Sequence, residues 1–231
     1  MKDISLFESA IGVSFSDKSI ITQAFTHRSY INENPNTGLS HNERLEFLGD
    51  AVLELVITDY LYKKYPDRAE GELTSYRSAL VNAVIISEIA SVLGMNDYLL
   101  LSRGEAKDMG KARTYILANT YEAVVGAIYL DQGYDSAKDF ILKSLAIRTE
   151  EIVKNKLWKD PKSFVQEKAQ EVYNVTPSYK VISESGPDHD KHFKIGIYFG
   201  EDLIAEGKGK SKQEAEQVAA KHALEVKKWL D

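Results

Sequence analysis

The sequence HNERLEFLGDAVLELVITDYLY at residues 41–62 decides the fold of the first part of the chain. At 100° per residue of an α-helix, four of its carboxylates fall on one narrow face: Glu43, Glu46, Asp50 and Glu54. Apolar residues flank this acidic stripe on both sides, so it is not simply the solvated back of an amphipathic helix. Like charges one turn apart destabilise a helix, and more so when they are desolvated. The stripe therefore requires arginine, protons or a divalent cation beside it.

A second apolar helix repeats the pattern in the sequence RTYILANTYEAVVGAIYLD at 113–131. Asn119 and Glu122 share a helical face, and Gly126 lies on the same face. A glycine inside a helix costs about 1 kcal/mol, and close approach of another helix is a physical reason to place it there. Packing this face against Glu46 and Asp50 would gather carboxylates and one amide oxygen. Oxygen ligands of this kind suit Mg²⁺ or Mn²⁺.

The alternative interpretation is that these acids are surface charges or members of helix-stabilising ion pairs. We expect this of Glu54, and Glu43 fits it as well. It suits Glu46, Asp50 and Glu122 less, because each lies inside an apolar run.

Composition narrows the classes of protein that remain. The 231 residues include 29 Lys and Arg against 35 Asp and Glu, a net charge of −6, and 43% are hydrophobic, enough for a buried core. The absence of cysteine excludes a disulfide scaffold, a cysteine-ligated zinc site and a thiol nucleophile. The acidic balance argues mildly against a polyanionic partner. We see no signal peptide and no long apolar segment, and therefore expect a cytoplasmic protein.

Apolar periodicity predicts that the first part of the chain is helical. The expected helices cover 17–29, 43–65, 72–93, 112–131 and 136–153, with a polar loop at 31–40. The pattern changes after about residue 154. We therefore expect a helical domain at 1–154, a short flexible linker at 155–159 and a second domain at 160–231.

The second domain has a different pattern of elements. Asp160 followed by Pro161 is typical of a helix start, and it opens a predicted helix at 161–173. Strands are predicted at 178–183, 192–199 and 203–210. A capping box of Ser211 and Glu214 opens a last helix that ends near 228. The predicted fold class is thus mostly α, an all-helical domain followed by a small α-β-β-β-α domain.

The sequence resembles the ribonuclease III family. The run NERLEFLGD at 42–50 is similar to the signature of that family, and a match of this length is highly specific. FTHRSY at 25–30, AEGELTSYRSALV at 69–81 and ILANTYEAVVGAIYLD at 116–131 resemble further family segments in the family order. The C-terminal part resembles a double-stranded-RNA-binding domain. The resemblance covers nearly the whole chain.

The resemblance implies a Mg²⁺-dependent endoribonuclease, with Mn²⁺ as a substitute, that acts as a homodimer on double-stranded RNA. Products would carry 5′-phosphates and short 3′ overhangs, and the role would be processing of ribosomal and messenger RNA precursors. By position, Asp50 and Glu122 match the catalytic acids of the family. The matching metal ligands are Glu46, Asp50, Asn119 and Glu122. Glu43 and Glu70 match acids implicated in substrate positioning or dimer contacts.

Asn119 departs from the family pattern, in which this position is usually an aspartate. An amide oxygen ligates Mg²⁺ without negative charge, so we expect weaker metal binding. A double-stranded-RNA-binding protein with a degenerate nuclease fold is therefore an alternative, and a helical scaffold protein is a third.

Chemistry follows from the residue types. The chain has no cysteine and none of its five histidines lies in the acidic stripe, so metal-assisted hydrolysis by a water molecule is the consistent mechanism. We expect His27 to be structural, and Arg28 and Arg44 to neutralise nearby acids. Lys107 and Lys111 could reach phosphate, although exposed lysines are usually only solvated.

The last predicted helix begins among lysines, which favours a phosphate-binding site. Its expected RNA-binding residues are Lys208, Lys210, Ser211 and Lys212, with Gln213 where the family often has a second basic residue. The resemblance adds Gln166 and Glu167, which would meet 2′-hydroxyls, and His189, which would enter the next minor groove. The alternative interpretation of these lysines is that they lie at an ordinary solvated strand end and bind nothing.

Overall fold

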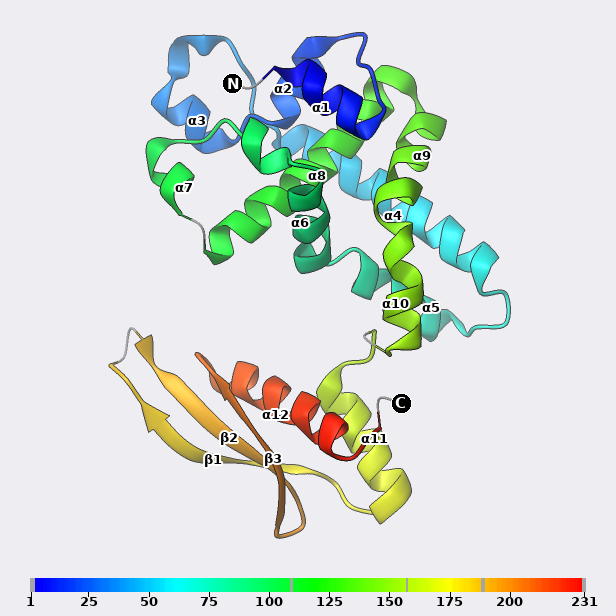
Figure 1. Cartoon of the computed structure of the whole chain (residues 1–231), viewed down its shortest axis with the longest axis vertical. Coiled ribbons are helices and arrows are strands. Elements are labelled where there is room, and N and C mark those ends of the chain that lie inside the picture. Colours follow the sequence, from blue (N-terminus) through cyan, green and yellow to red (C-terminus); the bar gives the residue numbers. More distant parts are fainter. Residues whose placement is uncertain (1–2, 109, 157, 188–189, 230–231) are drawn as a thin grey trace. The chain divides into compact units, whose positions relative to one another are not determined.

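The structure is a computed structural model that describes residues 3–108, 110–156, 158–187 and 190–229. The chain divides into two compact units between Ile152 and Val153 (Figure 1). The expected RNA-binding residue His189 lies outside the described residues. No helix in the described part of the chain is long and apolar enough to cross a membrane.

The first unit is built from helices, and the described residues form no extended strand in it. Their bounds are α1 Ile4–Ile11, α2 Lys18–Ala24, α3 Arg28–Glu33, η1 Pro35–Thr37, α4 Glu43–Lys64, α5 Glu70–Leu80, α6 Ala83–Val92, η2 Met95–Tyr98, α7 Arg103–Lys107, α8 Lys111–Gln132, α9 Tyr134–Ser144 and η3 Ala146–Arg148. A last helix, α10 Thr149–Lys154, crosses the division between the units.

Helix α8 forms the centre of the first unit (Figure 1). From Ile116 to Ile128 nearly every residue of α8 is buried, including the fully buried Tyr121. Helices α4 and α6 pack against it, and α4 makes the most extensive contact of any helix. Burial of these apolar side chains contributes a stabilising free energy of roughly 25 cal/mol for each Å² of apolar surface removed from water, and this stabilises the helix pair. The predicted helices at 43–65 and 112–131 are confirmed as α4 and α8.

Three predicted helices are broken where the sequence suggested continuity. The segment 17–29 separates into α2 and α3, because Thr26 pairs with Leu100 and His27 caps α3. The segment 72–93 separates at Asn82, whose side chain accepts hydrogen bonds from the backbone N–H groups of Val84 and Ile85 and starts α6. The segment 136–153 breaks at Leu145. Apolar periodicity continues across these breaks because the helices on both sides face one core, so periodicity alone could not reveal them.

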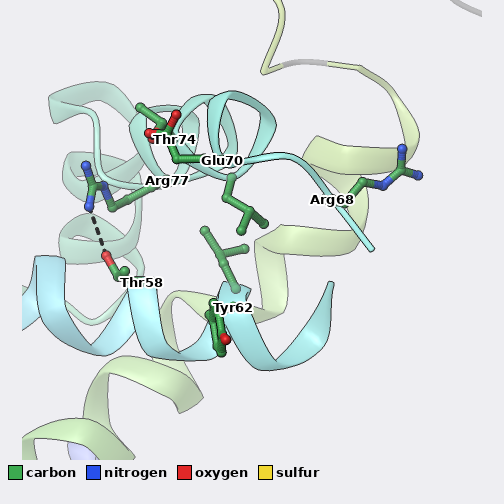
Figure 2. Close-up of a pocket in the computed structure, with 8 residues that line it drawn as sticks. Thr58, Tyr62, Arg68, Glu70, Thr74 and Arg77 are labelled. Carbon is green, nitrogen blue, oxygen red and sulfur yellow. Dashed lines mark hydrogen bonds between the residues drawn. The ribbon is translucent and has the colours of Figure 1, made fainter. Parts of the chain in front are cut away.

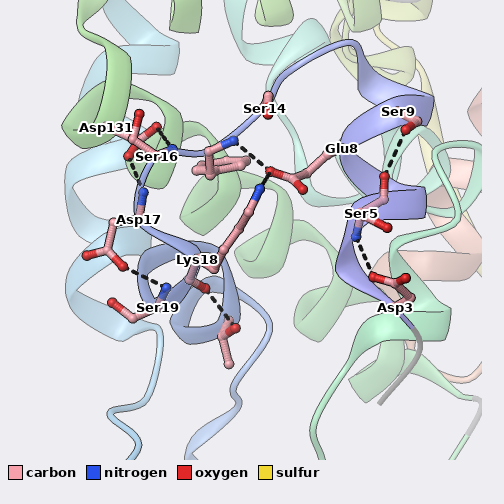
Figure 3. Close-up of polar contacts among 12 residues, drawn as sticks. Asp3, Ser5, Glu8, Ser9, Ser14, Ser16, Asp17, Lys18, Ser19 and Asp131 are labelled. Carbon is pink, nitrogen blue, oxygen red and sulfur yellow. Dashed lines mark hydrogen bonds and ion pairs between the residues drawn. The ribbon is translucent and has the colours of Figure 1, made fainter.

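Polar contacts attach the N-terminal segment to the end of α8 (Figure 3). The carboxylate of Glu8 accepts a hydrogen bond from Phe15 N at 2.6 Å and forms an ion pair with Lys18. The Asp131 carboxylate accepts hydrogen bonds from the backbone of Ser16 and Asp17 at 2.9 and 3.0 Å. Since Asp131 lies in the last turn of the central helix, these contacts fix the start of α2 against it.

The second unit has the predicted α-β-β-β-α order. It consists of α11 Pro161–Tyr173, β1 Ser178–Ser185, β2 His192–Phe199, β3 Asp202–Gly209 and α12 Lys212–Val226. The strands form an antiparallel sheet in the order β1-β2-β3. Phe164, Ile197, Ala219 and Leu224 belong to its core. At Gly207, an added Cβ would lie 2.2 Å from the Ala219 backbone, so α12 rests directly on β3.

Part of the segment predicted as a linker packs onto the second unit. The ammonium group of Lys159 lies 4.2 Å from the centre of the Phe164 ring and 3.2 Å from the Glu167 carboxylate. Lys156 donates a hydrogen bond to the backbone oxygen of Trp229 at 3.4 Å. These contacts belong to α11 and to the C-terminal end of the same unit.

Candidate functional site

Two glycines let the backbones of α4 and α8 touch where the helices cross. A Cβ added to Gly49 would lie 1.7 Å from the backbone oxygen of Glu122, and one added to Gly126 would lie 2.3 Å from that of Leu45. No side chain fits at either point. The close approach predicted from Gly126 is therefore present. Gly49 was missed, although a glycine inside an apolar helix was the same signal.

This crossing gathers acidic and amide side chains from both helices. The side chain of Asn119 on α8 hydrogen-bonds to the Glu46 carboxylate on α4. The charges of Asp50 and Glu46 act on Glu122, which lies one turn after Asn119. Asp50 is exposed, and the other three are partly buried, so solvent reaches the cluster. We call Glu46, Asp50, Asn119 and Glu122 the carboxylate cluster.

The cluster carries more negative charge than its surroundings compensate. Burial, with the charges of Asp50 and Glu46, raises the pKa of Glu122 to about 8. Burial and the charge of Glu43 also raise the pKa of Glu46, although the hydrogen bond from Asn119 opposes that rise. Carboxyl groups whose pKa is raised in this way are groups that a cation would stabilise in the ionised form.

The donor chemistry of the cluster fits a hard divalent cation. All donors are oxygens, three from carboxylates and one from an amide whose N–H group is engaged with Glu46. Among the described residues, no three His, Asp or Glu side chains are already arranged to hold a metal ion.

Raising the pH from about 5 to about 8 is expected to destabilise the protein in EDTA. Folded Glu122 keeps its proton up to a pKa of about 8, whereas the unfolded chain releases it near 4.5. Between these values the folded state binds more protons, so the free energy of unfolding falls as pH rises, by at most about 1.4 kcal/mol per pH unit. Urea unfolding followed by helical circular dichroism measures this slope.

The variant Glu122→Gln is the control for this titration. Glutamine does not titrate, so the slope between these pH values should become flatter. A slope unchanged by the substitution would contradict the assignment to Glu122.

The other acids of the stripe have partners outside the cluster. Glu43 forms an ion pair with Arg28 at 3.2 Å, and its carboxylate lies 3.7 Å from Nδ1 of His41. Glu54 pairs with Arg77 at 2.9 Å, as expected of a helix-stabilising acid. The predicted role of Arg28 in neutralising an acid is confirmed by its contact, whereas Arg44 is simply exposed.

His27 has a structural role, as predicted. Its Nδ1 atom accepts a hydrogen bond from the backbone N–H of Ser29 at 3.3 Å, which caps α3, and lies 2.8 Å from the Ser29 hydroxyl. Burial lowers the pKa of His27, which favours the neutral ring that this cap requires.

Glu70 lies at the start of α5 and lines a cavity of about 420 Å³ (Figure 2). Its carboxylate accepts a hydrogen bond from the Thr74 hydroxyl at 3.0 Å. Tyr62 and Arg77 line the same cavity. Large apolar side chains are exposed on the neighbouring helix α4, including Phe47 at 81% and Tyr62 at 71%. The residues that line this cavity include Glu70 but no member of the carboxylate cluster, so the cluster and Glu70 are distinct features of this unit.

The second unit presents its expected residues on its surface. The Ser211 hydroxyl accepts a hydrogen bond from Glu214 N at 3.1 Å, which confirms Ser211 as the cap of α12. The Glu214 carboxylate accepts its hydrogen bond from Lys210 N at 2.8 Å, one residue before the cap, so the reciprocal half of the predicted capping box is shifted by one residue. The remaining described residues of the predicted RNA face are also exposed: Gln166, Glu167, Lys208, Lys212 and Gln213.

A helical unit with a carboxylate cluster, joined to an α-β-β-β-α unit with lysines at a helix start, defines the class of two-domain nucleases that act on duplex RNA. The ribonuclease-III-like family model matches residues 17–148, and the double-stranded RNA binding motif matches residues 161–227. The chain belongs to the ribonuclease III family, and it is a double-stranded-RNA-specific endoribonuclease.

Relatives cover nearly all of the chain. It is 42% identical to Ribonuclease 3 of Nitratiruptor sp. over 99% of this chain and 98% of that protein. It is 45% identical to Ribonuclease 3 of Borreliella burgdorferi over 96% of this chain and 91% of that one. A crystal structure of the nuclease domain of ribonuclease III from Campylobacter jejuni covers 65% of this chain and 96% of its own, with a TM-score of 0.57 and 39% identity. A second structure of that domain, with a TM-score of 0.55, 39% identity and coverage of 64% and 97%, is described as flexible in a region involved in dimer formation.

Proposed function

We propose that the carboxylate cluster is the catalytic centre for cleavage of duplex RNA. Glu46, Asp50, Asn119 and Glu122 would hold Mg²⁺, for which Mn²⁺ would substitute, with Asp50 and Glu122 as the catalytic acids. The observation that carries this proposal is the contact of α4 and α8 at Gly49, which brings both pairs of residues together. A divalent cation supplies Lewis-acid stabilisation of the phosphate and a more acidic water molecule.

The side chains of the cluster prepare this chemistry. The Asn119 amide orients the Glu46 carboxylate by a hydrogen bond. Glu122 retains its proton near neutral pH until positive charge arrives, because its pKa is about 8. Glu43 and Glu70 would position substrate or contact the second subunit. Hydrolysis that breaks the bond to the 3′-oxygen would leave 5′-phosphates, and staggered cuts would leave short 3′ overhangs on processed ribosomal and messenger RNA precursors.

Labelled duplex RNA incubated with the protein in Mg²⁺ or EDTA tests this function. We expect cutting in Mg²⁺ and none in EDTA. A gel shift without cutting would instead support a binding protein with a degenerate nuclease fold. If the protein neither cuts the RNA nor shifts it in the gel, the result would support a helical scaffold protein.

Replacing Asn119 with Asp is expected to strengthen binding of the divalent cation. The substitution adds one negative charge to the cluster and keeps an oxygen ligand at the same place. We expect the Mg²⁺ concentration for half-maximal cleavage to fall about tenfold, which corresponds to about 1.4 kcal/mol. Calorimetric titration with Mg²⁺ measures the affinity directly.

The control for this variant is Asn119→Ala, which removes the ligand and should weaken binding. Equal Mg²⁺ affinity in Asn119→Asp and the unaltered protein would contradict the placement of residue 119 beside the cation.

We infer that the chain forms a homodimer through the exposed apolar face of α4. Phe47, Leu55 and Tyr62 are exposed on this face, and Tyr62 also lines the cavity that contains Glu70. The dimer-forming region named for the relative from Campylobacter jejuni supports this inference. Large exposed apolar side chains mark surfaces that another protein covers.

Phe47→Ala is expected to weaken the dimer by at least tenfold, because aromatic anchors dominate interface energies. Sedimentation equilibrium measures the dissociation constant. Val92→Ala is the control, since Val92 is equally exposed but lies at the end of α6. A dimer unaffected by loss of Phe47 would place the interface elsewhere.

The second unit would bind the duplex. Lys208, Lys210 and Lys212 would contact phosphates beside the start of α12, where Ser211 caps the helix and its dipole favours an anion. Gln213 would lie beside this contact. Gln166, Glu167 and His189 would reach the minor groove, where A-form shape is recognised.

A further inference from the structure

Two lysines of the proposed phosphate site already have anionic partners within the protein. The ammonium group of Lys212 lies 3.4 Å from the Glu184 carboxylate, at the end of β1. That of Lys210 lies 3.4 Å from the Asp190 carboxylate, just before β2. One partner therefore lies near the end of β1 and the other just before β2, and both meet the start of α12.

The backbone holds these carboxylates in place. Gly186 has a φ of +91°, and a Cβ there would lie 2.3 Å from the backbone oxygen of Asp190. Asp190 N donates a hydrogen bond to Pro187 O at 2.9 Å. Backbone contacts with Gly186 and Pro187 thus hold Asp190 near Lys210.

Glu184 is placed by the sheet. It pairs in register with Phe193 on β2. The ammonium group of Lys212 lies 5.6 Å from the centre of the Phe193 ring. Lys212 is consequently held between a carboxylate and an aromatic face, and Glu184 is the anion of that site.

We propose that Glu184 and Asp190 act as an intramolecular competitor of RNA phosphates for Lys212 and Lys210, and so set the affinity of the RNA-binding unit. This inference rests on the proposed contact of these lysines with RNA. A phosphate that approaches either lysine exchanges with a carboxylate instead of meeting a free cation. A ligand reaches its full affinity only when its phosphates displace the carboxylates from both lysines together.

The expected effect is moderate because the pairs are exposed. Lys210 and Asp190 are 74% and 53% exposed in their side chains, and Lys212 and Glu184 are 57% and 38% exposed. An exposed ion pair changes an equilibrium constant by less than about fivefold. Loss of both carboxylates should therefore tighten RNA binding by about tenfold.

The test measures binding of a fluorescent RNA duplex by the full chain in EDTA. The variant carries Glu184→Gln and Asp190→Asn. We expect its dissociation constant to be about tenfold lower than that of the unaltered protein at about 0.05 M salt, and the difference to shrink at about 0.5 M as charges are screened.

A second variant with the same change in net charge is the matched control. Glu201→Gln and Glu206→Gln remove carboxylates that pair with Lys180 and Lys194 on the sheet. We expect less than a twofold change from this control. An equal gain in both variants, or no gain in the first, would overturn the proposal.

Lys210→Ala with Lys212→Ala separates this inference from the proposed RNA contact. We expect these substitutions to weaken duplex binding at least tenfold. If they weaken binding while the Glu184 and Asp190 variant changes nothing, the competitor is overturned and the RNA contact stands. If the lysine variant binds normally, both are overturned.

Discussion

Glu122→Gln is expected to lower the rate of duplex RNA cleavage by at least about 10³-fold, equivalent to about 4 kcal/mol of transition-state stabilisation. Glutamine keeps the size of the side chain and one oxygen, but it removes the negative charge that a divalent cation requires. Single-turnover cleavage in excess Mg²⁺ measures the effect. Duplex affinity in EDTA should remain within about twofold, because the lysines proposed to bind RNA phosphates lie in the second unit and are unchanged.

Glu54→Gln is the matched control for this variant. Glu54 lies on the same acidic stripe of α4 but pairs with Arg77 instead of joining the carboxylate cluster. We expect cleavage within about threefold of the unaltered protein, since an exposed ion pair contributes little. Full activity of Glu122→Gln, or equal loss in both variants, would refute the proposed centre.

Gly49→Ala is expected to destabilise the first unit by about 3 kcal/mol or more. The added Cβ would lie 1.7 Å from the Glu122 backbone oxygen, and only separation of α4 from α8 relieves this contact. Forced overpacking typically costs about 1–3 kcal/mol, and backbone atoms yield less readily than side chains. Urea unfolding measures the change. Any protein that still folds should cleave RNA slowly, since Asp50 and Glu122 would move apart.

Gly71→Ala provides the control for the change from glycine to alanine. Gly71 lies in α5, and an added Cβ would meet no atom within 4 Å. Alanine favours a helix by up to about 1 kcal/mol, so this variant should be as stable as the unaltered protein or slightly more stable. A Gly49→Ala protein of normal stability would show that the helices do not touch at this point.

Local sequence signals predicted much of the second unit. The helix at 161–173 and the strand at 192–199 occur as predicted, and Ser211 caps the last helix through Glu214 N as expected. Each depends on neighbouring residues: a proline after a capping aspartate, alternating apolar residues, or a paired cap. Such signals act over a few residues and are readable without the fold.

The helix breaks of the first unit were less predictable. Thr26 is held by Leu100, a residue far along the chain, so no local signal marks the end of α2. Asn82 is different, because a capping asparagine was visible in the sequence within an apolar run. Periodicity concealed it, since α5 and α6 face the same core.

The sequence by itself determined which side chains could form the proposed catalytic centre. Residues 43–50 and 119–126 repeat at helical spacing, which fixes the faces of α4 and α8 that carry acids and glycines. Only the tertiary structure decided which of these acids meet. Glu54 turns to Arg77 and Glu43 to Arg28, whereas Glu46 and Glu122 converge, because the backbones touch at Gly49 and Gly126. Helical spacing sets direction along one helix, but the distance between two helices depends on how closely their backbones pack.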